Sequence, residues 1–236
     1  MNECDSILEL WKNFKEDIMY NNRFFPGNKK LIGELNEVLS ILSKYSSASI
    51  NKGFLVYRAR RGEFYREEDI RKPDPKKVYV DDRRCSPRGI SYFYVANNDI
   101  TAIHEVKPEI NEVVTIGKFK SKDSLKICWL DIINIPEENL IKELALSEKE
   151  RCLLKTILQD ISKPLNSQES LEYIPIQYIV ECIKHKSFAG FVFGSSLVKD
   201  GKNYIFFDDS KFELVDIKHV KVKNINIKYD YIDYIV

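Results

Sequence analysis

The sequence lacks several features that would assign the protein to a well-known class. No apolar run approaches the roughly 20 residues that a membrane-spanning helix needs. The N-terminal stretch MNECDSILEL is too acidic and too interrupted for a signal peptide. The five cysteines stand singly, without a CxxC pair or the Cys/His spacing of a zinc site. An odd, dispersed set is typical of reduced thiols. We therefore expect a cytoplasmic protein with free cysteines, no metal site and no membrane contact.

An excess of charge of one sign is also missing. The chain has 37 basic and 36 acidic residues, for a net charge of +1. Dedicated nucleic-acid binders usually have a strong basic excess, so nucleic acid is not the expected partner. The hydrophobic fraction is 44%, with thirteen Tyr and thirteen Phe. This composition predicts an ordered globular chain with a substantial core.

The common catalytic motifs are absent as well. The sequence contains no GxGxxG, no GxxxxGK[ST], no HExxH and no GxSxG. The three histidines, His104, His185 and His219, lie far apart. Rossmann oxidoreductases, P-loop phosphotransferases, zinc proteases and α/β-hydrolases are therefore not expected. Catalysis, if present, must use Arg, Tyr, Glu and Ser side chains from dispersed positions.

The first 50 residues are expected to form a helical extension. Apolar residues recur at helical spacing over 4–20 and again over 31–42, and Ser46-Ser47-Ala48-Ser49 is typical of a linker. So short a segment buries little surface alone, so it should pack on the rest of the chain. We divide the chain into an extension at 1–50 and a catalytic domain at 51–236.

The remainder alternates strands and helices without a regular βαβ order, which favours an α+β fold. We expect helices at 97–106, where Asn98 can cap the first turn, at 136–161 and at 173–185. Residues 62–90 are expected to form a long polar loop of the kind that often carries function. The expected strands are 54–60, 90–96, 113–119, 125–132, 189–196, 204–207, 212–220 and 225–232.

Three separated stretches together resemble the RES domain family. The first is Tyr57-Arg58-Ala59-Arg60. The second runs from Arg84-Cys85-Ser86-Pro87-Arg88-Gly89 through Tyr94 to His104-Glu105-Val106. The third comprises Gln177, the run Gly190-Phe191-Val192-Phe193-Gly194-Ser195-Ser196, and Gly201-Lys202-Asn203. The chain departs from the family pattern at Ser86, where Asn is common, and at Phe193, where Tyr is common.

The resemblance implies a fold and an activity. RES proteins resemble ADP-ribosyltransferases in fold, so it implies an ADP-ribosyltransferase-like mixed β core with flanking helices. Family members consume NAD+, often as bacterial toxins paired with an antitoxin, by hydrolysis or phosphorolysis. NAD+ would thus be a substrate rather than a cofactor, with inorganic phosphate as a possible co-substrate. An antitoxin and a homo-oligomer are the partners to consider.

The resemblance also implies site residues. The catalytic set is Arg58, Tyr94, Glu105 and Ser195, with Arg84, Arg60, Arg88 and Gln177 as substrate-binding residues. Glu105 would stabilise positive charge on the ribose as nicotinamide leaves. Arg58, and after it Arg84, would clamp the pyrophosphate, because a guanidinium pairs bidentately with phosphate oxygens. Tyr94 would stack on nicotinamide, and Ser195 would hold Arg58 or a ribose hydroxyl.

Two other functions remain open from the sequence. One is an ADP-ribosyltransferase that modifies a protein or an RNA. The other is a non-catalytic module that binds nucleic acid or a partner through the basic loop 83–88. The second predicts salt-sensitive nucleic-acid binding and no effect of NAD+ on thermal stability.

Overall fold

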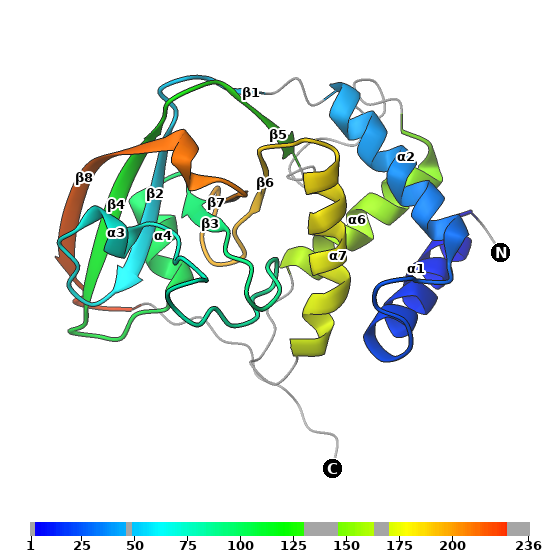
Figure 1. The fold of residues 1–236 in the computed structure, drawn as a ribbon, viewed down its shortest axis with the longest axis horizontal. Coiled ribbons are helices and arrows are strands. Elements are labelled where there is room, and N and C mark those ends of the chain that lie inside the picture. Colours follow the sequence, from blue (N-terminus) through cyan, green and yellow to red (C-terminus); the bar gives the residue numbers. More distant parts are fainter. Residues whose placement is uncertain (1–2, 46–48, 130–145, 163–169, 226–236) are drawn as a thin grey trace, which may run out of the picture.

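A computed structural model describes residues 3–45, 49–129, 146–162 and 170–225. A curved sheet forms one part of the molecule and a group of helices covers one end of it (Figure 1). No helix within the described ranges is both long and apolar enough to cross a membrane. The structure thus combines helices with a β-sheet, as the coarse part of the fold prediction requires.

Four helices make up the helical part. They are α1 (Glu3–Tyr20), α2 (Lys29–Tyr45), α6 (Glu148–Ser162) and α7 (Tyr173–His185), with a short 3₁₀ turn, η2 (Ser170–Glu172), before α7. Two small helices, α3 (Glu67–Ile70) and α4 (Asp99–Glu105), lie against the sheet at its other end. The helices predicted at 4–20, 31–42, 97–106 and 173–185 are thus confirmed.

The sheet has eight strands in the order β1-β5-β6-β7-β3-β2-β4-β8. The strands are β1 (Ser49–Ile50), β2 (Leu55–Arg61), β3 (Phe93–Ala96), β4 (Val113–Ser121), β5 (Leu125–Trp129), β6 (Gly190–Gly194), β7 (Lys202–Phe206) and β8 (Phe212–Lys221). The turn η3 (Asp209–Lys211) precedes β8. All neighbours are antiparallel except β5 and β6. The sheet is therefore mixed.

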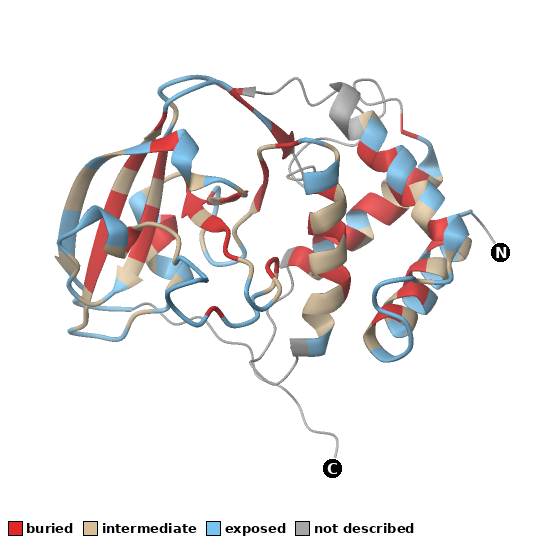
Figure 2. Cartoon of the chain, in the orientation of Figure 1, coloured by how far each residue is buried: buried red, intermediate tan, exposed pale blue. Residues whose placement is uncertain are grey.

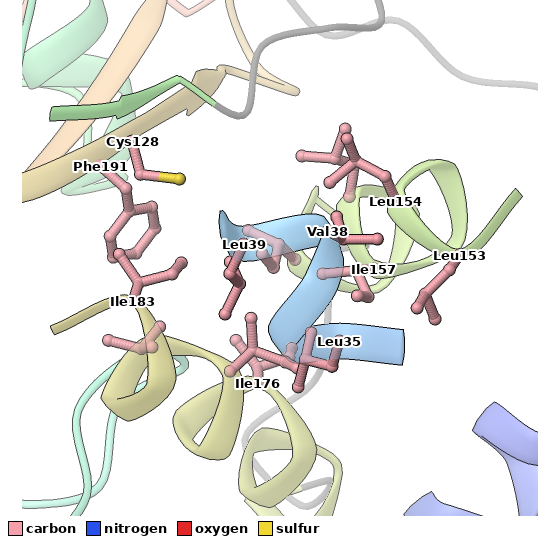
Figure 3. Packing of buried hydrophobic residues seen from close by; sticks show 14 of the residues in the cluster. Leu35, Val38, Leu39, Cys128, Leu153, Leu154, Ile157, Ile176, Ile183 and Phe191 are labelled. Atoms are coloured by element: carbon pink, nitrogen blue, oxygen red, sulfur yellow. The ribbon is translucent and has the colours of Figure 1, made fainter. Parts of the chain in front are cut away.

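One large core joins the N-terminal helices to the rest of the chain. Trp11 and Phe14 of α1 and Leu35 of α2 belong to the same buried cluster as Ile157 of α6 and Phe191 of β6. Figure 3 shows Leu35, Leu39, Ile157, Ile176, Ile183 and Phe191 packed together. Buried residues form stripes on α1, α2 and α6, where they alternate with exposed residues (Figure 2). The first 50 residues thus contribute to a shared core, as burial of apolar area requires.

The two faces of the sheet carry different clusters. Phe93, Phe119 and Phe212 belong to a core on one face, which we call the sheet core. On the other face, Ala59, Ala96, Ala102, Val114 and Ile116 form the α4 cluster, where small residues let α4 lie close to β2 and β4. Because strand side chains alternate, Tyr57 faces the α4 cluster and its neighbour Arg58 points the other way.

Several boundaries differ from the predictions. The strand expected at 90–96 begins only at Phe93, because Pro87 and the positive φ of Gly89 (82°) keep the preceding residues in a turn. Within the polar loop 62–90, the structure places the unpredicted helix α3, whose Ile70 is fully buried. Residues 46–48, the first part of the predicted helix 136–161, and most of the predicted strand 225–232 lie outside the described residues.

The expectation of five free cysteines was wrong. Cys4 of α1 and Cys152 of α6 form a disulfide, while Cys85, Cys128 and Cys182 are free. Packing of α1 on α6 brings the two Cα atoms to 5.7 Å, although the residues are 148 positions apart. Cysteine spacing along the chain cannot reveal a pairing that only helix packing creates.

Candidate functional site

A cavity of about 660 Å³ opens on the sheet between α4, the loop at 83–85 and the start of α7. This volume is in the range of small-molecule sites. Residues of strands β2, β3, β6 and β7 contribute to its lining. The lining residues are Tyr57, Arg58, Ala59, Arg60, Arg61, Arg83, Arg84, Cys85, Tyr94, Val95, Ala96, Ala102, Glu105, Val106, Lys107, Tyr173, Phe193, Gly194, Ser196, Leu197, Asn203 and Tyr204.

Arg58 lies where β2 and β3 separate. The two strands pair at one position, Tyr57 with Ala96, whereas β2 pairs with β4 along its whole length. Across the resulting gap, Nη1 of Arg58 donates a 2.9 Å hydrogen bond to the carbonyl oxygen of Tyr94. The Arg58 guanidinium therefore reaches the cavity although its side chain is only 7% exposed.

The environment of Arg58 is costly for a cation. Burial, and then the nearby charges of Arg83 and Arg60, lower the pKa of Arg58 to about 10. The buried Nε of Arg58 has no hydrogen-bond partner among the described residues. A buried donor without an acceptor costs free energy, and clustered charges of one sign are typical of binding sites. These properties suit a residue that binds an anion.

Glu105 is held by two donors that come from β7 and from the loop that follows β6. Oγ of Ser195 donates to Oε1 of Glu105 at 2.8 Å, and Nδ2 of Asn203 donates to the same oxygen at 2.7 Å. Oε2 of Glu105 makes no hydrogen bond to any described residue. One carboxylate oxygen is thus fixed by the protein and the other remains available to a ligand.

Local structure places these three residues. Asn98 caps the start of α4 by accepting a hydrogen bond from the backbone N–H of Thr101, and Glu105 is the last residue of this helix. Ser195 follows β6, and its backbone N–H donates to the carbonyl oxygen of Gly201 at 2.8 Å. Antiparallel pairing of β6 with β7 then sets Asn203 beside Ser195. Ser195 therefore contacts Glu105 and not Arg58.

Tyr94 is engaged on both its hydroxyl and its ring. Its hydroxyl lies 3.0 Å from Oγ of Ser86, and burial raises the pKa of the phenol. The guanidinium of Arg83 lies over the Tyr94 ring at 5.6 Å from the centroid. Ser86, which stands where the family commonly has Asn, thus joins the loop to Tyr94. These contacts make Tyr94 an anchor for the loop at 83–86.

Two of the predicted substrate-binding residues hold this loop. Nη1 of Arg84 donates at 2.6 Å to the carbonyl oxygen of Ile161 near the end of α6, and the Arg84 side chain lines the cavity. Nε2 of Gln177 donates at 3.0 Å to the carbonyl oxygen of Arg83. Gln177 does not line the cavity. It positions the loop that does.

The other two predicted substrate-binding residues differ in location. Arg60 lines the cavity, donates to the carbonyl oxygen of Asp69, and lies over the Phe64 ring at 4.3 Å. Arg88 does not line the cavity and is 64% exposed, with Asp81 as its ion-pair partner at 3.3 Å. Arg88 is thus a surface charge in this structure.

The cavity is strongly basic. Among the described residues that line it, six are cationic and Glu105 is the only acid. Arg61 is neutralised by Glu109 and Glu112, at 3.1 and 2.6 Å. The other five cations have no ion pair with a described carboxylate. The described chain contains no cluster of His, Cys, Asp or Glu suited to a metal ion. Charge and volume together favour an anionic small molecule.

Sequence reasoning did not select Asn203 as a site residue. Its signal was its place at the end of the third motif, eight residues after Ser195. A polar side chain at the start of a strand is common, so nothing in its type pointed to Glu105. The pairing of Phe193 with Asn203 across β6 and β7 places Asn203 where its amide can contact Glu105.

Comparison with known proteins assigns the chain to a family. The model of the RES domain matches residues 55–230. Among solved structures, the chain is similar to the M. tuberculosis MbcT–MbcA toxin–antitoxin complex, with 10% identity and a TM-score of 0.43. That likeness covers 77% of this chain and 92% of the other. No curated protein matches the sequence. Since the family match spans most of the chain, the protein belongs to the RES domain family.

Proposed function

We propose that the protein is an enzyme that consumes NAD+ by breaking the bond between nicotinamide and ribose. The observation that carries this proposal is the Glu105 carboxylate, held by Ser195 and Asn203 in a cavity whose other charged lining residues are all cationic. NAD+ has the complementary charges, because its pyrophosphate is anionic and its nicotinamide ring is cationic. Membership in the RES domain family supports the same substrate.

The chemistry follows from the charge that develops in the reaction. When the bond breaks, its electron pair leaves with nicotinamide, which becomes neutral, and positive charge moves onto the ribose. No proton is needed on the leaving group. The Glu105 carboxylate can stabilise the developing charge through Oε2 or hold a ribose hydroxyl. An electrostatic contact of this kind is stronger in a partly enclosed site than in bulk water.

The arginines would bind the phosphates. Arg58 has an unpartnered buried Nε, and Arg84 lines the same cavity, so each can offer N–H groups to phosphate oxygens. Arg60 and Arg83 would add to the positive potential. We propose water as the acceptor of the ribosyl group, so that ADP-ribose is the product. Phosphorolysis would instead consume inorganic phosphate.

The biological role we propose is that of a toxin or abortive-defence effector that depletes NAD+ in the cytoplasm, as expected for a RES protein. An antitoxin that blocks the cavity would be its partner. The basic loop that suggested nucleic-acid binding is largely engaged within the protein, since Arg84 bonds to Ile161 and Arg88 pairs with Asp81. That contact pattern favours the enzyme over the binding module.

The test is turnover of NAD+ by the purified protein, followed by chromatography of nicotinamide and ADP-ribose with and without phosphate. Wild type should release nicotinamide, and Glu105→Gln should lower the rate at least about 100-fold, as loss of one electrostatic group at a reacting centre does. Glu213→Gln, which removes a surface carboxylate paired with Lys120, is the matched control. Free ADP-ribose indicates hydrolysis, and ADP-ribose 1-phosphate indicates phosphorolysis. When labelled NAD+ is used in the same assay, label that is retained on a protein or an RNA indicates ADP-ribose transfer. Absence of nicotinamide release by wild type overturns the proposal.

A further inference from the structure

We infer that Tyr57, rather than Tyr94, is the aromatic residue that contacts the nicotinamide ring. This inference rests on the proposed function and identifies how the site recognises the leaving group. It follows from which tyrosine ring faces the cavity beside Glu105, and from what already covers the other ring.

The first observation concerns Tyr94. Arg83 lies over the Tyr94 ring, and the Tyr94 hydroxyl bonds to Ser86. The ring also packs against the large core shared by the helices. A second planar group could stack there only by displacing Arg83 or the core.

The second observation is the position of Tyr57 relative to Glu105. Tyr57 packs on the α4 cluster, and so does Val106, the residue that follows Glu105. Tyr57, Glu105 and Val106 all line the cavity. A group bound against the Tyr57 ring would therefore lie on the wall that carries the carboxylate. In NAD+, the nicotinamide ring is the aromatic group attached to the reacting ribose carbon.

The third observation concerns the chemistry of the Tyr57 ring. Tyr57 is half-buried, and its hydroxyl has no hydrogen bond to any described residue. Nζ of Lys118, its partner across β2 and β4, lies 5.9 Å from the ring centroid. Tyr57 lines the cavity and Lys118 does not, so Lys118 leaves the part of the ring at the cavity accessible. The nicotinamide of NAD+ is a cationic ring, for which a tyrosine face is a suitable contact.

The experiment compares two ligands on the same variants. Dissociation constants for NAD+ and for ADP-ribose are measured by calorimetry in the Glu105→Gln background, which prevents turnover. ADP-ribose carries every part of NAD+ except nicotinamide. Adding Tyr57→Leu should weaken NAD+ binding about tenfold, equivalent to about 1.4 kcal/mol, and change ADP-ribose binding less than twofold. Tyr57→Phe keeps the ring and should bind both ligands as the parent does.

Controls separate this inference from the proposed function. Tyr20→Leu changes a tyrosine that is 66% exposed on α1 and should leave both constants unchanged. Equal weakening of both ligands by Tyr57→Leu would show a structural or adenine-binding role and overturn the inference. Unchanged NAD+ binding would overturn it as well. If wild type releases nicotinamide in either case, the proposed function stands. If wild type neither binds nor cleaves NAD+, both fail together.

Should Tyr57→Leu not fold, Tyr57→Trp serves as the second variant, and loss of NAD+ binding with this larger ring would contradict stacking.

Discussion

The Oγ of Ser195 lies 2.8 Å from Oε1 of Glu105, although 90 residues separate the two along the chain. The Asn203 amide reaches the same oxygen. The contact joins the end of α4 to the loop between β6 and β7 and fixes the orientation of a carboxylate at the cavity wall. Substitutions at these residues and at their neighbours can test what the arrangement does.

Removing either donor to Glu105 should lower turnover without weakening binding. We expect Ser195→Ala and Asn203→Ala each to lower kcat about tenfold and leave KM for NAD+ nearly unchanged, because each helps to orient Oε1. Since both donors act on one oxygen, the double variant should lose less than the product of the single effects. Steady-state kinetics of wild type, the two single variants and the double variant give the double-mutant cycle that measures this coupling. A rise in KM with unchanged kcat would instead assign both side chains to substrate binding.

Arg58 should contribute to binding and not to stability. Its pKa falls from the usual value for arginine to about 10 on folding, so the folded state disfavours the cation. The resulting penalty is present at every pH below about 10 and is relieved as the pH rises above 10 toward the usual arginine pKa. At pH 7.5, the Arg58→Met variant should therefore melt at a temperature no lower than that of wild type. NAD+ should raise the melting temperature of wild type but not that of the variant.

Thermal melting with and without NAD+ measures both quantities. Arg66→Met, which removes an arginine that is 74% exposed, is the control and should keep the response to NAD+. A marked drop in the melting temperature of Arg58→Met would identify Arg58 as a structural residue.

Gly201 should be intolerant of a side chain because of its neighbours at the site. A Cβ at this position would lie 2.8 Å from Oγ1 of Thr101, 3.0 Å from the carbonyl oxygen of Val198 and 3.1 Å from Cβ of Ser195. Gly201→Ala should therefore displace the Ser195 loop, lower turnover about tenfold and cost about 1–3 kcal/mol of stability. Gly33→Ala in α2 meets nothing within 4 Å and should stabilise the helix by about 0.5–1 kcal/mol. Wild-type turnover by Gly201→Ala would contradict the described packing of this loop.

The disulfide should stabilise the helical part of the molecule. The Cys4–Cys152 disulfide closes a loop of 148 residues. A link of this kind restricts the unfolded chain and so raises the free energy of unfolding by about 2–5 kcal/mol. Reduction, or Cys4→Ser, should lower the melting temperature by several degrees. Thiol titration of the unfolded protein should find three free cysteines before reduction and five after it. Five thiols in the unreduced protein would disprove the link.

Local parts of the site were predictable from sequence because they depend on neighbouring residues. The Asn98 cap and the short helix that ends at Glu105 follow from side-chain type and spacing. The short helix α3 was missed because its burial depends on a distant contact, in which Ile70 packs over Gly117 of β4. The Cys4–Cys152 bond was missed for the same reason, since helix packing across the chain creates it.

The roles of the site residues were less predictable than their identities. Arg58 and Glu105 do share one cavity, as the resemblance implied. Ser195, however, holds Glu105, and Gln177 supports a loop without reaching the cavity. Asn203 was not selected at all. The contacts of Ser195 and Asn203 depend on which strands pair, and the contact of Gln177 depends on how α7 packs against the loop at 83–86.

The sequence by itself determined the family, the mixed α/β character and the helices whose periodicity and caps are local. The tertiary structure decided which polar groups meet, because hydrogen bonds act over about 3 Å. The residues that form them can lie far apart in the chain, as Trp11 and Asp160 do at 149 positions. The separation of β2 from β3 is another such outcome, and it lets a buried guanidinium reach the cavity. Side-chain type sets what a residue can do, and strand register sets what it does.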